Sequence, residues 1–260
     1  MASFLNHSKP LVTGMVRMPD PENMLAAIRN CIWDGADAIG FQVCMLDPQY
    51  RTDKTLTKLF SACAEKPIYV TNFRVGFNER LTDEQCVEGL LQALRCGGTM
   101  GDVMGDLFNP TPTEINREPE SVKRQKEVID RIHDMGKEVI ISSHTKIPMT
   151  INEVVELALE YQERGADMVK IVINSLSEEQ EMEALQTTRA LKKALDVPFL
   201  FLCNGSHYKI HRAMGAVFGC AMTLGVHEHD PIHGYNQPRI TALRYLLDHF
   251  DFTPDRVMLD

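Results

Sequence analysis

The sequence predicts an α/β protein, a (β/α)8 TIM barrel that forms a single domain over residues 1–260. Three observations support this fold. Short apolar runs alternate eight times with helical patterns, at roughly thirty residues per unit. No linker, low-complexity run or charge block divides the chain. No Gly-x-Gly-x-x-Gly turn follows the first predicted strand, as it would in an open doubly wound sheet with a dinucleotide site.

The first unit shows how each element is justified. Leu11–Val16 is an apolar run of strand length. Asp20-Pro21 starts a helix that is acidic and has proline in its first turn. One face of this helix carries the apolar residues Met24, Leu25, Ile28, Cys31 and Ile32. Asp34–Asp37 ends the helix and leads into a second strand, Ala38–Cys44.

The same alternation continues along the chain. Further strands are predicted at Ile68–Phe73, Met100–Asp106, Glu138–Ser143, Met168–Asn174, Phe199–Leu202 and Gly219–Val226. Helices are predicted at Lys54–Ala64, Asp83–Cys96, Ser121–Met135, Asn152–Arg164, Ser177–Leu195, His207–Phe218 and Ile240–Phe250. In such a barrel the loops after the strands gather at one rim, and functional residues are expected there.

Composition argues against several classes of protein. A formal net charge of -9 without a basic block argues against a nucleic-acid partner. The chain contains no run of eighteen apolar residues, so no membrane span is predicted. Met1–Pro10 lacks the apolar stretch of a signal peptide. The 7 cysteines are odd in number and form no CxxC pair. This usage favours free thiols and a cytoplasmic location.

The strand Met168–Asn174 carries one amine, Lys170, in a continuously apolar run. Such a run is typical of a strand buried on both faces. Desolvation disfavours the charged form of an amine, and a neutral amine is a nucleophile that can form a Schiff base with a ketone. The alternative is a lysine whose stem crosses apolar surface while its head reaches water.

Two rim residues are candidates for proton transfer near this amine. His144 closes the apolar strand Val139–Ser143, and a histidine side chain has a reference pKa near operating pH. Asp106 ends the neighbouring strand, where a carboxylate can fix the tautomer of His144. The alternatives are a histidine that is hydrogen-bonded in a packed corner and an aspartate that caps a helix or a loop.

Arginines and amides at other strand ends are candidates for binding a substrate. Arg212 opens a helix beyond the seventh strand, where a guanidinium can hold a carboxylate through two parallel hydrogen bonds. Arg74 stands at the mouth of the third strand. The loops after strands seven and eight add Asn204, His233 and Gln237. For both arginines, a surface ion pair is the alternative.

A histidine cluster competes with this site. His227-Glu228-His229-Asp230 and His233 hold ligand types that bind zinc. The cluster lies on one segment past the eighth strand, so it does not bring ligands from separate strands together. We therefore predict a polar loop over the barrel and no metal.

Four segments carry a resemblance to a known family: Asn72–Arg74, Ile141–His144, Gly165–Ile171 and His211–Gly219. In the order and spacing of histidine, lysine and arginine, the chain resembles the type I 3-dehydroquinate dehydratases from about Leu11 to Phe250. These are Schiff-base enzymes of the shikimate and quinate routes of aromatic amino acid metabolism.

The resemblance implies a role for each candidate. The family's Schiff-base lysine falls on Lys170 and its acid–base histidine on His144. Asp106 stands, one methylene shorter, for the glutamate that orients this histidine. The residues implied to bind substrate are Arg212 for the carboxylate, Arg74 beside it, and Gln237 in the loop over the site.

The chain also departs from the family's pattern. The family has a Glu-x-Arg pair at the end of strand two, where this chain has Gly40-Phe41-Gln42. His233 replaces the serine of the lid loop, and Phe201–Gly205 replaces a methionine-rich seventh strand. The N-terminal hairpin that caps the family's barrel is expected to be reduced or absent. These changes affect the pocket that recognises hydroxyls and leave the amine and the histidine in place.

We therefore predict a hydro-lyase that acts on 3-dehydroquinate or a related cyclic keto acid, through an imine and without a metal or organic cofactor. A small-molecule substrate and a homodimer are expected, since barrels of this kind often pair through their helices. Alternatively, a class I aldolase would release two fragments where dehydration gives one. A catalytically inactive ligand-binding barrel would leave Lys170 unmodified by borohydride and a keto acid, and a metal-dependent hydrolase would contain its metal.

Overall fold

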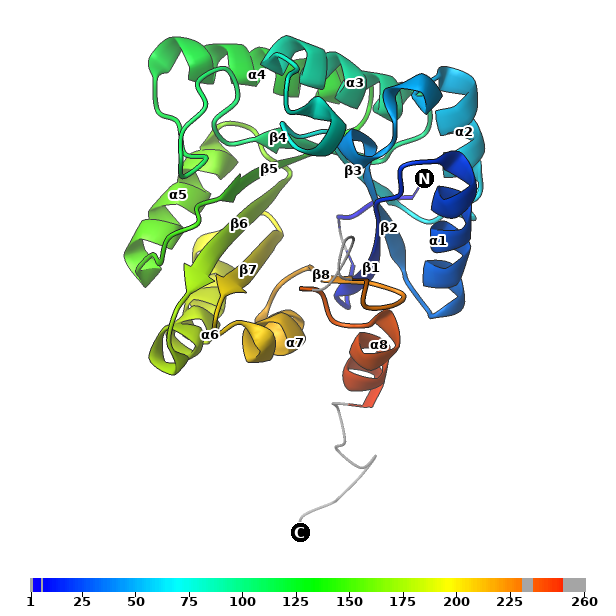
Figure 1. Cartoon of the computed structure of the whole chain (residues 1–260). Coiled ribbons are helices and arrows are strands. Elements are labelled where there is room, and N and C mark those ends of the chain that lie inside the picture. Colours follow the sequence, from blue (N-terminus) through cyan, green and yellow to red (C-terminus); the bar gives the residue numbers. More distant parts are fainter. Residues whose placement is uncertain (1, 6, 231–235, 250–260) are drawn as a thin grey trace.

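The computed structural model describes residues 2–5, 7–230 and 236–249, and these form a (β/α)8 barrel (Figure 1). The strands are β1 (Leu11–Val16), β2 (Ala38–Gln42), β3 (Ile68–Thr71), β4 (Met100–Met104), β5 (Glu138–His144), β6 (Met168–Ser175), β7 (Phe199–Gly205) and β8 (Met222–Gly225). The α-helices are α1 (Pro21–Trp33), α2 (Asp53–Ser61), α3 (Asp83–Arg95), α4 (Pro119–Asp134), α5 (Ile151–Glu163), α6 (Glu178–Ala194), α7 (Lys209–Phe218) and α8 (Ile240–His249). The predicted fold class is confirmed.

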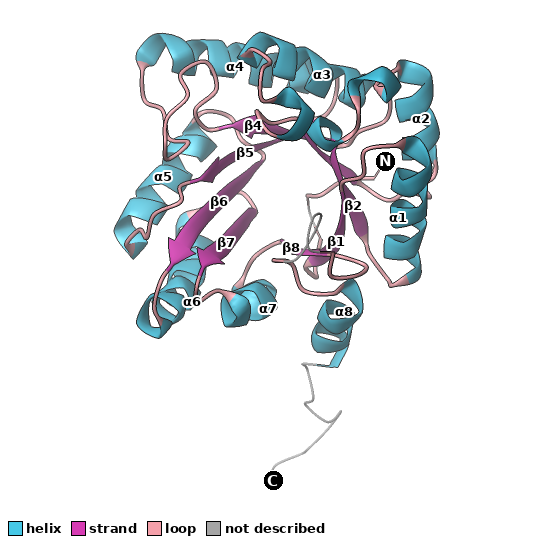
Figure 2. Ribbon diagram, in the orientation of Figure 1, coloured by secondary structure: helices cyan, strands magenta, loops and turns pink. Residues whose placement is uncertain are grey.

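The strands form one parallel sheet that curls into a ring inside a ring of helices (Figure 2). The hydrogen-bonded order is β7-β6-β5-β4-β3-β2-β1-β8. The seam of the barrel therefore lies between β7 and β8, where the Ala221 amide donates to the Phe199 carbonyl at 2.9 Å. Every helix of this ring connects two parallel strands or follows the last one, as the alternation in the sequence predicts.

Two apolar cores separate the inside of the barrel from its outside. Alternate strand residues such as Met168 and Val172 belong to the inner core, whereas Val169 and Ile171 pack outward beneath the helices. Phe4 joins the inner core and packs its ring edge-on against Tyr69, with centroids 6.4 Å apart. Among the described residues ahead of β1, none forms a strand.

Strand register sets the height of each inward side chain. Lys170 pairs with Ser142 on β5, which pairs with Met104 on β4. Two residues closer to the mouth of the barrel on β5, His144 pairs with Val172. Two residues deeper on β5, Ile140 pairs with Asp102 of β4. Lys170 therefore lies between Asp102 below and His144 above, on three neighbouring strands.

Element ends differ from the prediction at β4. The strand ends at Met104, two residues before Asp106, because the chain turns there. The Leu107 amide donates to the Met104 carbonyl at 3.1 Å, and the Asp106 carboxylate accepts from the Thr111 amide at 2.8 Å. The seven cysteines are free, as predicted. Within the described residues, no helix has the length and apolarity required to span a bilayer.

Candidate active site

A cavity of about 450 Å³ opens at the C-terminal ends of the strands. It brings together seven of the eight side chains that the sequence predicted. The three catalytic candidates, Lys170, His144 and Asp106, all line it. So do four substrate-binding candidates, Arg212, Arg74, Asn204 and Gln237. The eighth, His233, lies outside the described residues.

Lys170 projects into the barrel and is 4% exposed. Its Nζ donates to the Tyr69 hydroxyl at 2.9 Å and lies 3.4 Å from Asp102 Oδ2. The rings of Tyr69 and Phe73 each lie with their centroids 5.5 Å from Nζ. The alternative that this lysine reaches bulk water is therefore wrong. The carboxylate of Asp102 beside this amine was not predicted from the sequence.

His144 is oriented by Glu114, a residue of the long loop between β4 and α4. Both the Nδ1 and the backbone amide of His144 lie 2.9 Å from Glu114 Oε2. Burial raises the pKa of Glu114, but the hydrogen bonds and charge of His144 outweigh it and leave that pKa below its ordinary value. With Nδ1 donating to this carboxylate, Nε2 keeps the lone pair that can accept a proton.

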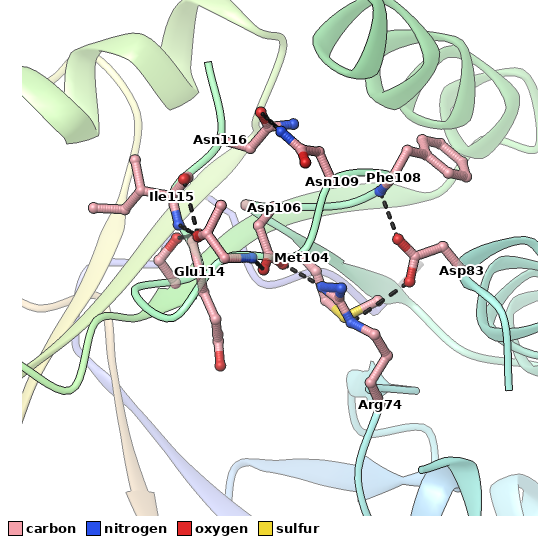
Figure 3. A network of polar contacts seen from close by, with 12 residues as sticks. Arg74, Asp83, Met104, Asp106, Phe108, Asn109, Glu114, Ile115 and Asn116 are labelled. Carbon is pink, nitrogen blue, oxygen red and sulfur yellow. Dashed lines mark hydrogen bonds and ion pairs between the residues drawn. The ribbon is translucent and has the colours of Figure 1, made fainter. Parts of the chain in front are cut away.

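Asp106 does not orient His144, and that part of the prediction is wrong. Its Oδ1 instead accepts a hydrogen bond from Arg74 Nη2, and Arg74 Nε lies 3.5 Å from Asp83 (Figure 3). Burial is the main cause that raises the pKa of Asp106. Asp106 thus positions Arg74 at the rim. Arg74 Nη1 is buried and has no hydrogen-bond partner among the described residues.

Arg212 is held by neutral oxygens. Its Nε donates to the Cys203 carbonyl at 2.8 Å. Its two terminal nitrogens donate to Gln237 at 2.7 Å and to Asn204 at 2.6 Å. Burial lowers the pKa of Arg212 to about 10, which leaves it a cation at neutral pH. None of these partners is a carboxylate, so the site presents a positive charge that an anionic ligand can balance.

Comparison with known proteins identifies the family of this chain. The family model for type I 3-dehydroquinase matches residues 14–251. The chain belongs to the type I 3-dehydroquinase family. A 3-dehydroquinate dehydratase of Syntrophotalea carbinolica is 28% identical over 174 residues, which cover 65% of this chain and 64% of the relative, just under two thirds of its length.

Solved 3-dehydroquinate dehydratases share the fold of this family member. The Geobacillus kaustophilus structure matches with a TM-score of 0.80 at 19% identity, over 98% of this chain and 97% of that one. The type I structure from Clostridium difficile matches with a TM-score of 0.78 at 21% identity, over 95% and 94%. At these identities the likeness shows the fold alone.

At strand two, Gly40 packs against the end of the Met15 side chain. A Cβ at Gly40 would lie 2.2 Å from Met15 Sδ, so the Met15 side chain occupies the space of any side chain at position 40. Gln42 lines the cavity, and Arg17, which follows β1, lines it as well.

The histidine cluster is dispersed. His227 Nδ1 lies 2.7 Å from Asp34, and His229 Nε2 lies 3.1 Å from the Gln237 carbonyl. In the part of the chain that the structure describes, no three histidine, cysteine, aspartate or glutamate side chains are placed to hold a metal.

Sequence reasoning missed three residues of the site: Asp102, Tyr69 and Glu114. Asp102 could have been found from the sequence, because it is a charged residue inside the predicted strand Met100–Asp106, as Lys170 is inside the strand Met168–Asn174. Tyr69 had no distinguishing signal in an ordinary strand. Glu114 follows Pro110-Thr111-Pro112-Thr113 in a loop, and spacing alone cannot predict that this loop folds back to His144.

Proposed function

We propose that this chain is a 3-dehydroquinate dehydratase that works through an imine on Lys170. One observation carries the proposal: a buried amine, a histidine with a carboxylate on its far nitrogen, and an arginine without a carboxylate partner face one cavity. The amine supplies the covalent electron sink, the histidine moves the proton and the arginine binds the acid group.

The proposed reaction starts from the ammonium of Lys170, which gives up one proton within the site so that Nζ can attack the ring ketone. That proton and a second one from nitrogen leave with the ketone oxygen as water. The resulting iminium acidifies the neighbouring carbon. His144 Nε2 removes a proton there and gives an enamine, then returns that proton to the departing hydroxyl, so that water is lost. A second water hydrolyses the iminium and frees the enone. The iminium is the electron sink, so we propose that no metal or organic cofactor takes part.

Three features support the binding mode. Arg212 and Arg74 line the cavity as cations, so we place the substrate carboxylate at Arg212 and a second substrate oxygen near Arg74. Asn204 and Gln237 hold Arg212, so their part in binding is to orient the guanidinium. The Clostridium difficile relative contains covalently modified comenic acid, a covalent ligand in the same fold.

Incubation with 3-dehydroquinate tests the proposal. We expect the conjugated enone to appear in the ultraviolet at a rate proportional to protein concentration. The absence of any signal at high protein concentration rejects 3-dehydroquinate as the substrate. A related keto acid with a different hydroxyl pattern is the next substrate to assay, because Gly40 and Gln42 alter the wall that the family uses.

We also propose a cytoplasmic homodimer. Free cysteines support the reducing location. Trp33 on α1 and Tyr245 on α8 are 89% and 73% exposed, and large exposed aromatic side chains on helices support pairing through the helices. Light scattering should give twice the chain mass, and Trp33→Lys should reduce it to one chain. A monomeric wild-type protein contradicts the dimer.

A further inference from the structure

A buried carboxylate next to the reacting nitrogen has no part in the mechanism above. Asp102 is 2% exposed, and its Oδ2 lies 3.4 Å from Lys170 Nζ. Its other oxygen, Oδ1, is buried without a hydrogen-bond partner among the described residues. Burying a carboxylate in an apolar strand costs free energy unless a cation balances its charge. Lys170 is the cation that offsets this cost for Asp102.

Tyr69 completes this cluster. Its hydroxyl donates to Asp102 Oδ2 and accepts from Lys170 Nζ at 2.9 Å. Burial, and then the charge of Asp102, raise the pKa of Tyr69 well above its ordinary value. Tyr69 therefore stays a phenol, and the negative charge of the cluster stays on Asp102.

The register places this negative charge on the far side of the nitrogen from the substrate. Asp102 lies one step deeper in the barrel than Lys170, and the cavity opens on the other side. The remaining carboxylates of the site are engaged elsewhere, Asp106 by Arg74 and Glu114 by His144. The cations Arg17, Arg74, Lys146 and Arg212 line the same cavity. In the described part of the chain, Asp102 is the one carboxylate that pairs with Lys170.

We propose that Asp102 is the fixed counter-ion of the covalent intermediate: it pairs with the ammonium of free Lys170 and then with the iminium at the same position. This inference rests on the proposed function. The step balances without solvent protons. An ammonium and a ketone give an iminium and water, because one ammonium proton stays on nitrogen and two leave with the ketone oxygen. The charge beside Asp102 is +1 before and after.

Loss of the carboxylate changes this balance. In Asp102→Asn, the buried nitrogen lacks its counter-ion, and desolvation favours the neutral amine. An iminium then forms only when one proton is taken from solvent. The amount of adduct becomes pH-dependent and falls about tenfold for each unit of pH increase. In the wild-type protein the amount stays constant over the same range.

Proton uptake during adduct formation tests the inference. Protein and 3-dehydroquinate are mixed in weakly buffered solution with a pH indicator, and adducts are counted by borohydride quenching and mass spectrometry. We expect close to zero protons per adduct for wild type and about one for Asp102→Asn. Tyr69→Phe keeps the carboxylate and should behave as wild type. Asp37→Asn, which removes a carboxylate that binds Arg244 at the base of the barrel, is the matched control.

The outcomes separate this inference from the proposed function. A wild-type protein that takes up about one proton per adduct overturns the counter-ion role, whether or not the variant folds. An Asp102→Asn protein that forms adduct without proton uptake overturns it as well. A wild-type protein that forms no adduct contradicts the proposed function, and the inference falls with it.

Discussion

The two sides of the cavity differ in how their cations are balanced. On the side formed by β3 to β6, which we call the acid–base wall, each basic group faces a carboxylate. Lys170 faces Asp102, His144 faces Glu114, and Arg74 faces Asp106. On the side formed by β7 and α7, which we call the anion wall, Arg212 donates its hydrogen bonds to the neutral oxygens of Cys203, Asn204 and Gln237.

This difference assigns a task to each wall. A base that already has a carboxylate gains little from a second anion, but it has a partner that stabilises its protonated form, which suits proton transfer. A buried guanidinium with amide partners keeps its full attraction for an anion, and the low dielectric strengthens that attraction. The account therefore predicts large effects on chemistry from the acid–base wall and effects on binding from the anion wall.

The largest effect is expected at Lys170. Lys170→Met removes the amine and should lower turnover about 10,000-fold or more, because the covalent path is lost. It also leaves Asp102 buried and unpaired, which should reduce the free energy of unfolding by about 3–5 kcal/mol. Urea denaturation measures this loss. The double variant with Asp102→Asn should recover most of the stability and none of the activity. Equal stability of all three proteins would contradict the buried ion pair.

Substitution of His144 should slow the proton transfer and leave the formation of the imine on Lys170 intact. His144→Gln should lower kcat about 100- to 10,000-fold, because no base removes the proton beside the iminium. Adduct trapped by borohydride should persist or accumulate. Stopped-flow absorbance and mass spectrometry measure the two steps. Loss of the adduct together with turnover would show that His144 acts earlier than proposed.

The two arginines form a matched pair across the walls. Arg212→Gln should lower kcat/KM about 100-fold, mainly through KM, because two charge-assisted hydrogen bonds to the substrate carboxylate are lost. Arg74→Gln should lower it only about tenfold, because Asp83 and Asp106 already offset the charge of Arg74. Steady-state kinetics with one substrate compares them. A larger effect at Arg74 would reverse the assignment of the walls.

The smallest effect concerns a histidine of the anion wall. His211 is buried next to Arg212, and burial, then the Arg212 charge, lowers its pKa to about 3. The unfolded chain binds this proton near pH 6.5, so the unfolded state is favoured as the pH falls from 6.5 toward 3. As the pH falls from 7 to 5, protonation of His211 in the unfolded chain should reduce the free energy of unfolding by up to about 1.4 kcal/mol for each pH unit. His211→Gln should remove this dependence, and an NMR titration of the His211 ring near pH 6.5 would contradict it.

The sequence supplied the barrel and the main reactive groups, but it did not supply their partners. Lys170 and His144 could be predicted because a charged or basic residue in an apolar strand is unusual and its height follows from strand order. The partner of His144 could not, because Glu114 reaches it through a loop whose path depends on local contacts, with Glu114 itself at a φ of 53°. Asp106 was the expected partner because it follows the neighbouring strand, but Arg74 binds it instead.

Borohydride reduction of the wild-type protein with 3-dehydroquinate, followed by peptide mass spectrometry, tests most directly whether the acid–base wall holds a covalent intermediate. Lys146 is an internal control, because it lines the same cavity and its side chain is 70% exposed. The account predicts a reduced adduct on Lys170 and an unmodified Lys146. An adduct on Lys146, or none on either lysine under conditions of turnover, would contradict it.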